Sequence, residues 1–245
     1  MPTVLAKEET MKKVTRQPLG NRLVHAITAV SVFTLFFTGF GQMPVYKRYM
    51  LTEIPGFAWT GEYFTTLWWH YFFGVVLIAV SVYHVTYHML RKEYDIVPKR
   101  GDLKDSWLVI KAMLAGKEEP PSEKYLPEQR LGYAFIAFWI GVMVITGILK
   151  AIKNVNGIDF GPQMLFWTAQ LHNLGFFMLI IGVAGHLAAF LFKPNRQLLP
   201  GMLWGTVCAC YVKMRHSLWK EGKKEAEEAI LKHGGEEEAC KDFKH

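Results

Sequence analysis

Six histidines lie in stretches of the chain that contain no Asp, Glu, Lys or Arg. They are His25, His70, His84, His88, His172 and His186. Ionisable residues in apolar segments of membrane-spanning length are rare and usually functional. Because no carboxylate accompanies these histidines, a proton relay built from mixed acids and histidines fits poorly. Histidine alone favours metal ligation, most of all ligation of haem iron.

The spacing of the histidines repeats between two segments. His70 and His84 are 14 residues apart, and so are His172 and His186. In an α-helix, 14 residues rise about 21 Å and turn about 1400°, roughly 40° short of four full turns. Each pair therefore lies near one helix face at two depths. We predict that His70 and His172 share the outer level, while His84 and His186 share the inner level.

Two haems stacked across a membrane fit this layout. Each iron would take two imidazoles, which leaves no open coordination position and favours electron transfer over oxygen chemistry. Covalent attachment is not expected, because the chain has no C-x-x-C-H motif. His25 also lies at the inner level, so the residues alone leave both His25 and His84 as partners for His186.

Four charge-free windows position these histidines. They cover residues 23–46, 63–90, 131–149 and 160–192. A bilayer-spanning helix needs about 20 apolar residues, so the windows predict four spans, at about 23–42, 65–90, 131–149 and 164–192. The expected fold is all-α, an integral membrane four-helix bundle over residues 21–199. This pattern excludes an ordinary soluble enzyme, a disulfide scaffold and a disordered chain.

The cationic residues predict the orientation of the spans. Of the 28 Lys and Arg residues, 24 lie in the two tails and the central connection, and four lie in the other two connections. By the positive-inside rule, the side of the membrane that holds the two tails and the central connection is cytoplasmic, so both termini are inside. The net charge of +7 therefore reflects membrane topology and does not indicate nucleic-acid binding. A multi-pass protein of the bacterial inner membrane is expected.

The cytoplasmic segments carry weaker signals. Residues 1–20 form a polar N-terminal tail that we expect to be loosely ordered, and residues 200–245 form an amphipathic and charged tail. Amphipathic helical patterns occur within 103–117 and 204–229. Cys208, Cys210 and Cys240 lie on the predicted cytoplasmic side, where they are expected to stay reduced.

Several motifs accompany the histidines. They are Arg22-x-x-His25, His70-x-x-x-Gly74, His172 with His186, Tyr125-x-x-x-Gln129-Arg130, Gly201-Met202-Leu203-x-Gly205, His216 and Trp219. In these residues the chain resembles the cytochrome b (gamma) subunit of membrane-bound respiratory formate dehydrogenases, over roughly residues 17–232. That family belongs to a wider group of bacterial four-helix di-haem cytochromes b, which also serve nickel–iron hydrogenases.

The resemblance implies a set of haem ligands. His70 and His172 are expected to hold an outer haem b, and His25 and His186 an inner haem b. The resemblance thus favours His25 over His84, although spacing alone favours His84.

The resemblance also implies a site for menaquinone or ubiquinone beside the inner haem. Gln129, Glu128 and His186 are its candidate residues, and Glu128 is a candidate for passing protons from the cytoplasm. The chain departs from the family here, because the family's polar Asn and Gly positions are Leu126 and Glu128.

The expected partners follow from the same family. Electrons arrive from an iron–sulfur subunit, which joins a catalytic dehydrogenase subunit on the periplasmic side, and they leave to the quinone near the cytoplasmic face. The chain itself contains no dehydrogenase active site that we can identify. The alternatives are the cytochrome b subunit of a nickel–iron hydrogenase, a stand-alone di-haem quinone-reactive cytochrome, and a haem-free transporter with histidine relays.

Overall fold

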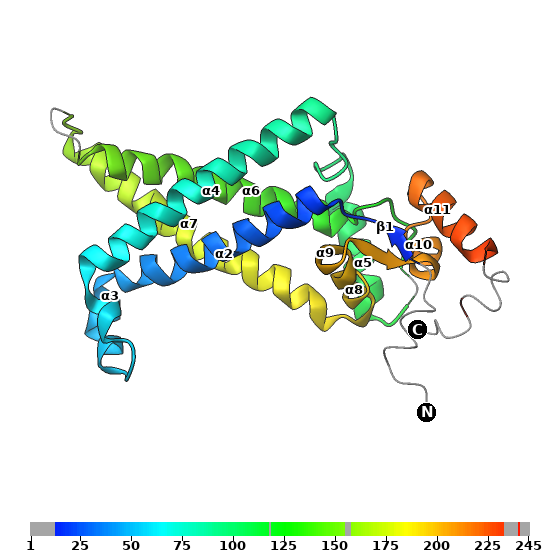
Figure 1. Cartoon of the computed structure of the whole chain (residues 1–245), viewed down its shortest axis with the longest axis horizontal. Helices are drawn as coiled ribbons and strands as arrows, with labels where there is room; N and C mark the ends of the chain where they lie inside the picture. The colour runs from blue at the N-terminus through cyan, green and yellow to red at the C-terminus, as the bar shows by residue number, and fades with distance from the viewer. Residues whose placement is uncertain (1–12, 118, 155–157, 233–239, 241–245) are drawn as a thin grey trace. The chain divides into compact units, whose positions relative to one another are not determined.

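Four long helices dominate the structure, a computed structural model that describes residues 13–117, 119–154, 158–232 and 240. The helices are α2 (Leu19–Gly41), α4 (Tyr63–Arg91), α6 (Pro127–Ile152) and α7 (Pro162–Ala188) (Figure 1). Each is long and apolar enough to cross a membrane. The predicted all-α fold with four membrane helices is therefore confirmed.

The chain divides into two compact units. One unit, here called the span unit, contains residues 23–92 and 136–183. The other unit, here called the end unit, contains both ends of the described chain together with the described residues of 93–135 and 184–245.

The span unit is held together by apolar contacts among its helices. Val32 of α2 packs against Leu77 and Val80 of α4, and Ile140 of α6 and Val183 of α7 contact the same cluster. Many other large apolar side chains on these helices are exposed. Such outward-facing apolar surface is what lipid contact requires.

A short irregular segment connects α2 to α4 within the span unit. It contains α3 (Pro44–Arg48), η1 (Leu51–Glu53) and η2 (Ala58–Gly61). Tyr46 and Thr60 are both buried, and their hydroxyl oxygens form a hydrogen bond of 2.7 Å. This bond joins α3 to η2, so the connection is a compact structure.

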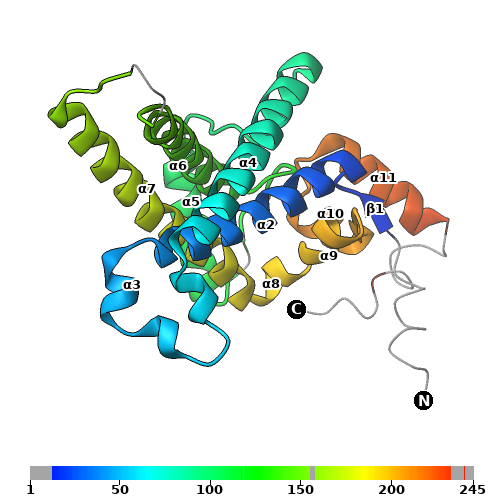
Figure 2. The ribbon, with the colours of Figure 1, turned by 60° about the vertical axis from the view of Figure 1, so that its left-hand side comes forward.

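The end unit contains a small folded core that the sequence did not predict. β1 (Lys13–Thr15) pairs antiparallel with β2 (Thr206–Cys208), with Val14 opposite Val207. α10 (Ala209–Arg215) and α11 (Lys220–Leu231) lie beside this strand pair (Figures 1 and 2). The buried core cluster consists of Val14, Val207, Ala209, Val212, Ala226 and Ile230.

This core corrects two expectations. Residues 204–229 do not form one amphipathic stretch, because their apolar side chains cover a strand pair and each other. Residues 13–20 are not a loose tail, because β1 takes part in the core and Arg16 and Gln17 are buried. Residues 1–12 lie outside the described residues.

A glycine allows the chain to close this strand pair. The carbonyl of Gly205 accepts hydrogen bonds from the backbone N–H groups of Arg16 (2.8 Å) and Gln17 (3.1 Å). Gly205 has a φ of +89°, which other residues rarely adopt. A Cβ there would also lie 2.8 Å from the carbonyl oxygen of Gln17. These constraints explain why glycine occupies this position.

The predicted amphipathic helix of the central connection is present as α5 (Asp102–Leu114). Arg130, in the first turn of α6, fixes the first residue of α5. It donates to the Asp102 carboxylate from Nε (2.8 Å) and Nη2 (2.5 Å). Both side chains are nearly fully buried. Trp107 and Leu103 lie on the exposed side of the helix. The chain continues after α7 through η3 (Ala189–Leu191), α8 (Lys193–Arg196) and α9 (Leu199–Leu203).

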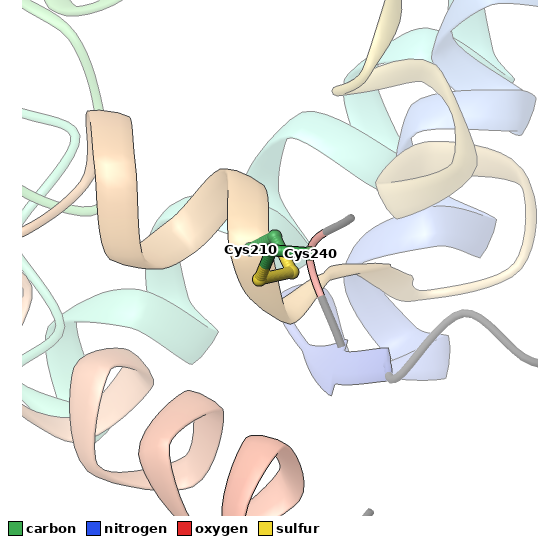
Figure 3. Close-up of a disulfide and its surroundings, with 2 residues drawn as sticks. All are labelled: Cys210 and Cys240. Atoms are coloured by element: carbon green, nitrogen blue, oxygen red, sulfur yellow. A yellow bond between two sulfur atoms is a disulfide. The ribbon is translucent and has the colours of Figure 1, made fainter. Parts of the chain in front are cut away.

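The cysteine prediction was wrong for two of the three residues. Cys210 and Cys240 form a disulfide with a Cα–Cα distance of 5.7 Å (Figure 3), and Cys208 is free. The expectation came from the compartment alone. The sequence does not reveal the pair, because only the fold of the end unit brings the two Cα atoms within the range that a disulfide requires.

Candidate functional site

Two of the predicted ligand residues lie opposite each other in the span unit. His70 is in the second turn of α4, and His172 is in the third turn of α7. The centres of their imidazole rings are 6.3 Å apart, and the ring planes meet at 63°. The structure thus brings together the pair that the sequence predicts at one level.

This separation can be tested against a shared metal ion. Each metal–nitrogen bond is about 2 Å, and each ring centre lies about 1.1 Å beyond its nitrogen, so two opposed imidazoles have centres about 6–6.5 Å apart. The observed 6.3 Å lies in this range. By this distance, the two imidazoles could hold one metal ion between them.

A threonine from the preceding helix contacts each of these histidines. The Thr38 hydroxyl of α2 lies 2.9 Å from Nδ1 of His70. The Thr146 hydroxyl of α6 lies 2.9 Å from Nδ1 of His172. Among the described residues, the side-chain hydrogen bonds of both rings are made at Nδ1 and none is made at Nε2. The arrangement therefore occupies one ring nitrogen of each histidine and leaves the other for a ligand.

A glycine follows each threonine and allows the ring to approach. A Cβ on Gly39 would lie 3.3 Å from Cε1 of His70, which is a tight contact. A Cβ on Gly147 would lie 3.6 Å from Cε1 of His172, an ordinary contact. None of these four residues was predicted from the sequence to take part in the site. The repeated Thr-Gly pair in the first and third spans is the signal that could have found them.

The other histidines of the apolar windows are arranged differently. The rings of His84 and His88 lie against each other on α4, with centres 4.5 Å apart. His25 is in the second turn of α2 and belongs to the span unit, whereas His186 is in the last turn of α7 and belongs to the end unit. The assignment of His25 and His186 as inner ligands stays a prediction.

The candidate quinone residues all belong to the end unit. The Gln129 side-chain oxygen accepts from Arg16 Nη2 (3.3 Å) and from the backbone N–H of Leu126 (3.2 Å), so it holds the turn before α6 together. Both carboxyl oxygens of Glu128 are buried and have no hydrogen-bond partner among the described residues. Burying such a group without a partner is costly, which fits a residue that exchanges protons better than a structural one.

His216, one of the residues on which the resemblance rests, is held by hydrogen bonds within the end unit. It is fully buried, its Nδ1 donates to the carbonyl of Glu123 (2.6 Å), and its Nε2 accepts from Arg16 Nη1 (3.2 Å). Burial and the nearby Arg16 cation lower the pKa of His216 to about 3. Burial also lowers the pKa of Arg16. A neutral His216 with both ring nitrogens engaged holds the segments of the end unit together.

The comparison with known proteins agrees with the histidine pattern. A family model described as prokaryotic cytochrome b561 matches residues 16–205, which is more than three quarters of the chain. The matched region begins and ends at the two residues whose backbones bond to each other beside the β1–β2 pair. No curated protein matches the chain.

Proposed function

This chain belongs to the prokaryotic cytochrome b561 family of membrane electron carriers that bind haem b, and from that premise we propose that it is the di-haem, quinone-reducing subunit of a respiratory formate dehydrogenase. It connects an iron–sulfur subunit outside with a quinone near the cytoplasmic face. The catalytic dehydrogenase subunit lies beyond the iron–sulfur subunit. The observation that carries the proposal is the opposed pair His70 and His172.

We assign His70 and His172 to the outer haem, and His25 and His186 to the inner haem. When bound, haem b supplies reversible one-electron transfer between ferric and ferrous iron. The protein would fix where this happens, since each pair of histidines would hold one haem iron through two imidazoles and leave no coordination position for another ligand. The distance between His70 and His172 and their shared hydrogen-bonding pattern support the outer assignment. The inner assignment depends on the resemblance.

Quinone reduction needs protons as well as electrons. We propose that Glu128 delivers protons, because its buried carboxyl has no partner among the described residues. Gln129 keeps the turn before α6 in place, and His186 joins this site to the inner haem. The quinone is menaquinone or ubiquinone.

The membrane and orientation follow from charge. The excess of Lys and Arg in the tails and the central connection supports a cytoplasmic location for the end unit, in the bacterial inner membrane. The exposed apolar side chains of Leu103 and Trp107 suit α5 to the inner membrane surface. The outer partner then meets the opposite ends of the spans.

The first experiment is a reduced-minus-oxidised visible spectrum with a pyridine haemochrome count on the purified chain. We expect b-type bands and two haems per chain. His70→Ala should remove one haem, His25→Ala the other, and His84→Ala neither. A folded chain without b-type bands would refute the proposal. Two haems in the His25→Ala variant would transfer the inner ligand to His84.

The partner enzyme needs a separate test, because the family match does not distinguish formate dehydrogenase from nickel–iron hydrogenase. Affinity purification of the tagged chain from native membranes, followed by metal analysis, separates the possibilities. Molybdenum or tungsten in the complex supports a formate dehydrogenase, and nickel supports a hydrogenase. A fully active chain that purifies alone supports the stand-alone cytochrome.

A further inference from the structure

We propose that Thr38 and Thr146 are positioning residues that fix the tautomer of the two outer haem ligands and make those ligands stronger electron donors. The inference rests on the proposed function, since it needs a haem between His70 and His172. It extends that function to two residues that do not contact the iron. The evidence is the direction of the hydrogen bonds around each threonine.

The Thr38 hydroxyl has one hydrogen, which it donates to a backbone carbonyl of its own helix. Its Oγ1 donates to the carbonyl of Thr34, four residues earlier, at 2.8 Å. The same oxygen lies 2.9 Å from Nδ1 of His70. Because the hydroxyl hydrogen is directed to the carbonyl, Oγ1 accepts from His70, so Nδ1 carries the proton. The Nε2 lone pair of His70 is then available to a metal.

Thr146 repeats this arrangement on the other side of the site. Its Oγ1 donates to the carbonyl of Val142 at 2.7 Å and lies 2.9 Å from Nδ1 of His172. The two threonines occupy equivalent places, because each lies on the membrane helix before its histidine and is followed by a glycine at which a Cβ would contact the same ring. Both ligands are therefore held in the same tautomer by the same device.

The hydrogen bonds have a chemical consequence beyond orientation. An imidazole that donates its second N–H to an oxygen acceptor is a more basic ligand, and loss of such a partner typically weakens metal binding 10–100-fold. A more basic ligand favours ferric over ferrous iron, which lowers the reduction potential. Two equivalent bonds should make two similar contributions to the potential of the outer haem.

The test compares valine and serine at both positions in the full-length protein. Thr38→Val and Thr146→Val keep the side-chain shape and remove the hydroxyl, whereas Thr38→Ser and Thr146→Ser keep it. Redox titration should show one haem with a more positive midpoint potential in each valine variant and a near-parental potential in each serine variant. A tenfold loss of ferric preference corresponds to about 59 mV for one electron. The second haem reports whether the variant is folded.

Thr34→Val is the matched control, because the Thr34 hydroxyl donates to the carbonyl of Val30 (2.8 Å) one turn earlier on the same helix. It should leave both potentials unchanged. Loss of the outer haem in the valine variants alone also supports the inference. Parental potentials and haem content in both valine variants, serine variants that behave like valine, or an equal shift in Thr34→Val would each overturn it. A parental protein without haem would instead refute the proposed function.

Discussion

Removing one partner of the buried ion pair between Asp102 and Arg130 should be among the most destabilising single changes in the end unit. The side chains are only 3% and 7% exposed, and the two hydrogen bonds between them measure 2.8 and 2.5 Å. Hydrogen bonding from Arg130 lowers the pKa of Asp102, with burial acting in the opposite direction. Asp102→Ala removes the buried carboxylate and leaves the buried guanidinium of Arg130 with only the weaker, half-exposed carboxylate of Glu123, at 3.4 Å. Breaking such a pair from one side costs about 3–5 kcal/mol.

A matched comparison separates burial from charge. Lys99 forms an ion pair with Glu123 in the same segment, but these side chains are 46% and 43% exposed. Exposed pairs contribute about 0–1 kcal/mol, so Lys99→Ala should change the unfolding free energy little. In the double variant Asp102→Ala with Arg130→Met, most of the lost stability should return, because no unpaired charge stays buried.

The measurement is a urea titration of the purified protein in detergent micelles, followed by pulse proteolysis of the end unit. The midpoint for Asp102→Ala should fall far below those of the parental protein and Lys99→Ala. Equal midpoints for Asp102→Ala and Lys99→Ala would refute the reasoning. So would a double variant as unstable as Asp102→Ala.

Three further predictions concern the end unit. The folded pKa of His216, about 3, lies below its unfolded value of about 6.5, so between these values the unfolded state binds one more proton than the folded state. The contribution of His216 to stability should therefore be complete above about pH 6.5 and fall toward pH 3, by up to 1.4 kcal/mol per pH unit. In urea titrations at several pH values, His216→Gln should flatten this slope. Cys210 and Cys240 are 30 residues apart, so under oxidising conditions Cys210→Ser should lower the free energy of unfolding by about 3–4 kcal/mol. The control is Cys208→Ser, and a Cys210→Ser variant as stable as this control would contradict the prediction. Glu128→Gln should slow quinone reduction at least tenfold without changing haem content, and an unchanged rate in stopped-flow measurements would remove Glu128 from the proton path.

The four membrane helices could be predicted from sequence because the signal is local. The length and composition of a charge-free window predict a membrane span without any knowledge of the residues that the helix packs against. The pairing of His70 with His172 was also predictable, since helix periodicity and the common direction of two spans set their depths. The threonines were not found, because a span threonine normally bonds only to its own helix and nothing local reveals a second acceptor role.

The end unit could not be predicted for a different reason. β1 and β2 have three residues each and lie at opposite ends of the chain, so neither carries a recognisable strand pattern. Their pairing depends on contacts that form only in the folded protein. The same is true of Gln129, whose amide looks suited to a ligand in the sequence but bonds to Arg16 and Leu126 in the structure.

The β1–β2 pair has a consequence for biosynthesis. Lys13 pairs with Cys208, and a ribosome adding about 5–20 residues each second needs roughly 10–40 s to travel between them. The first strand must therefore wait until every span has left the ribosome. The two strands can therefore pair only after all four spans have been synthesised. A nascent chain stalled after the third span would expose Val14 to chaperones and proteases.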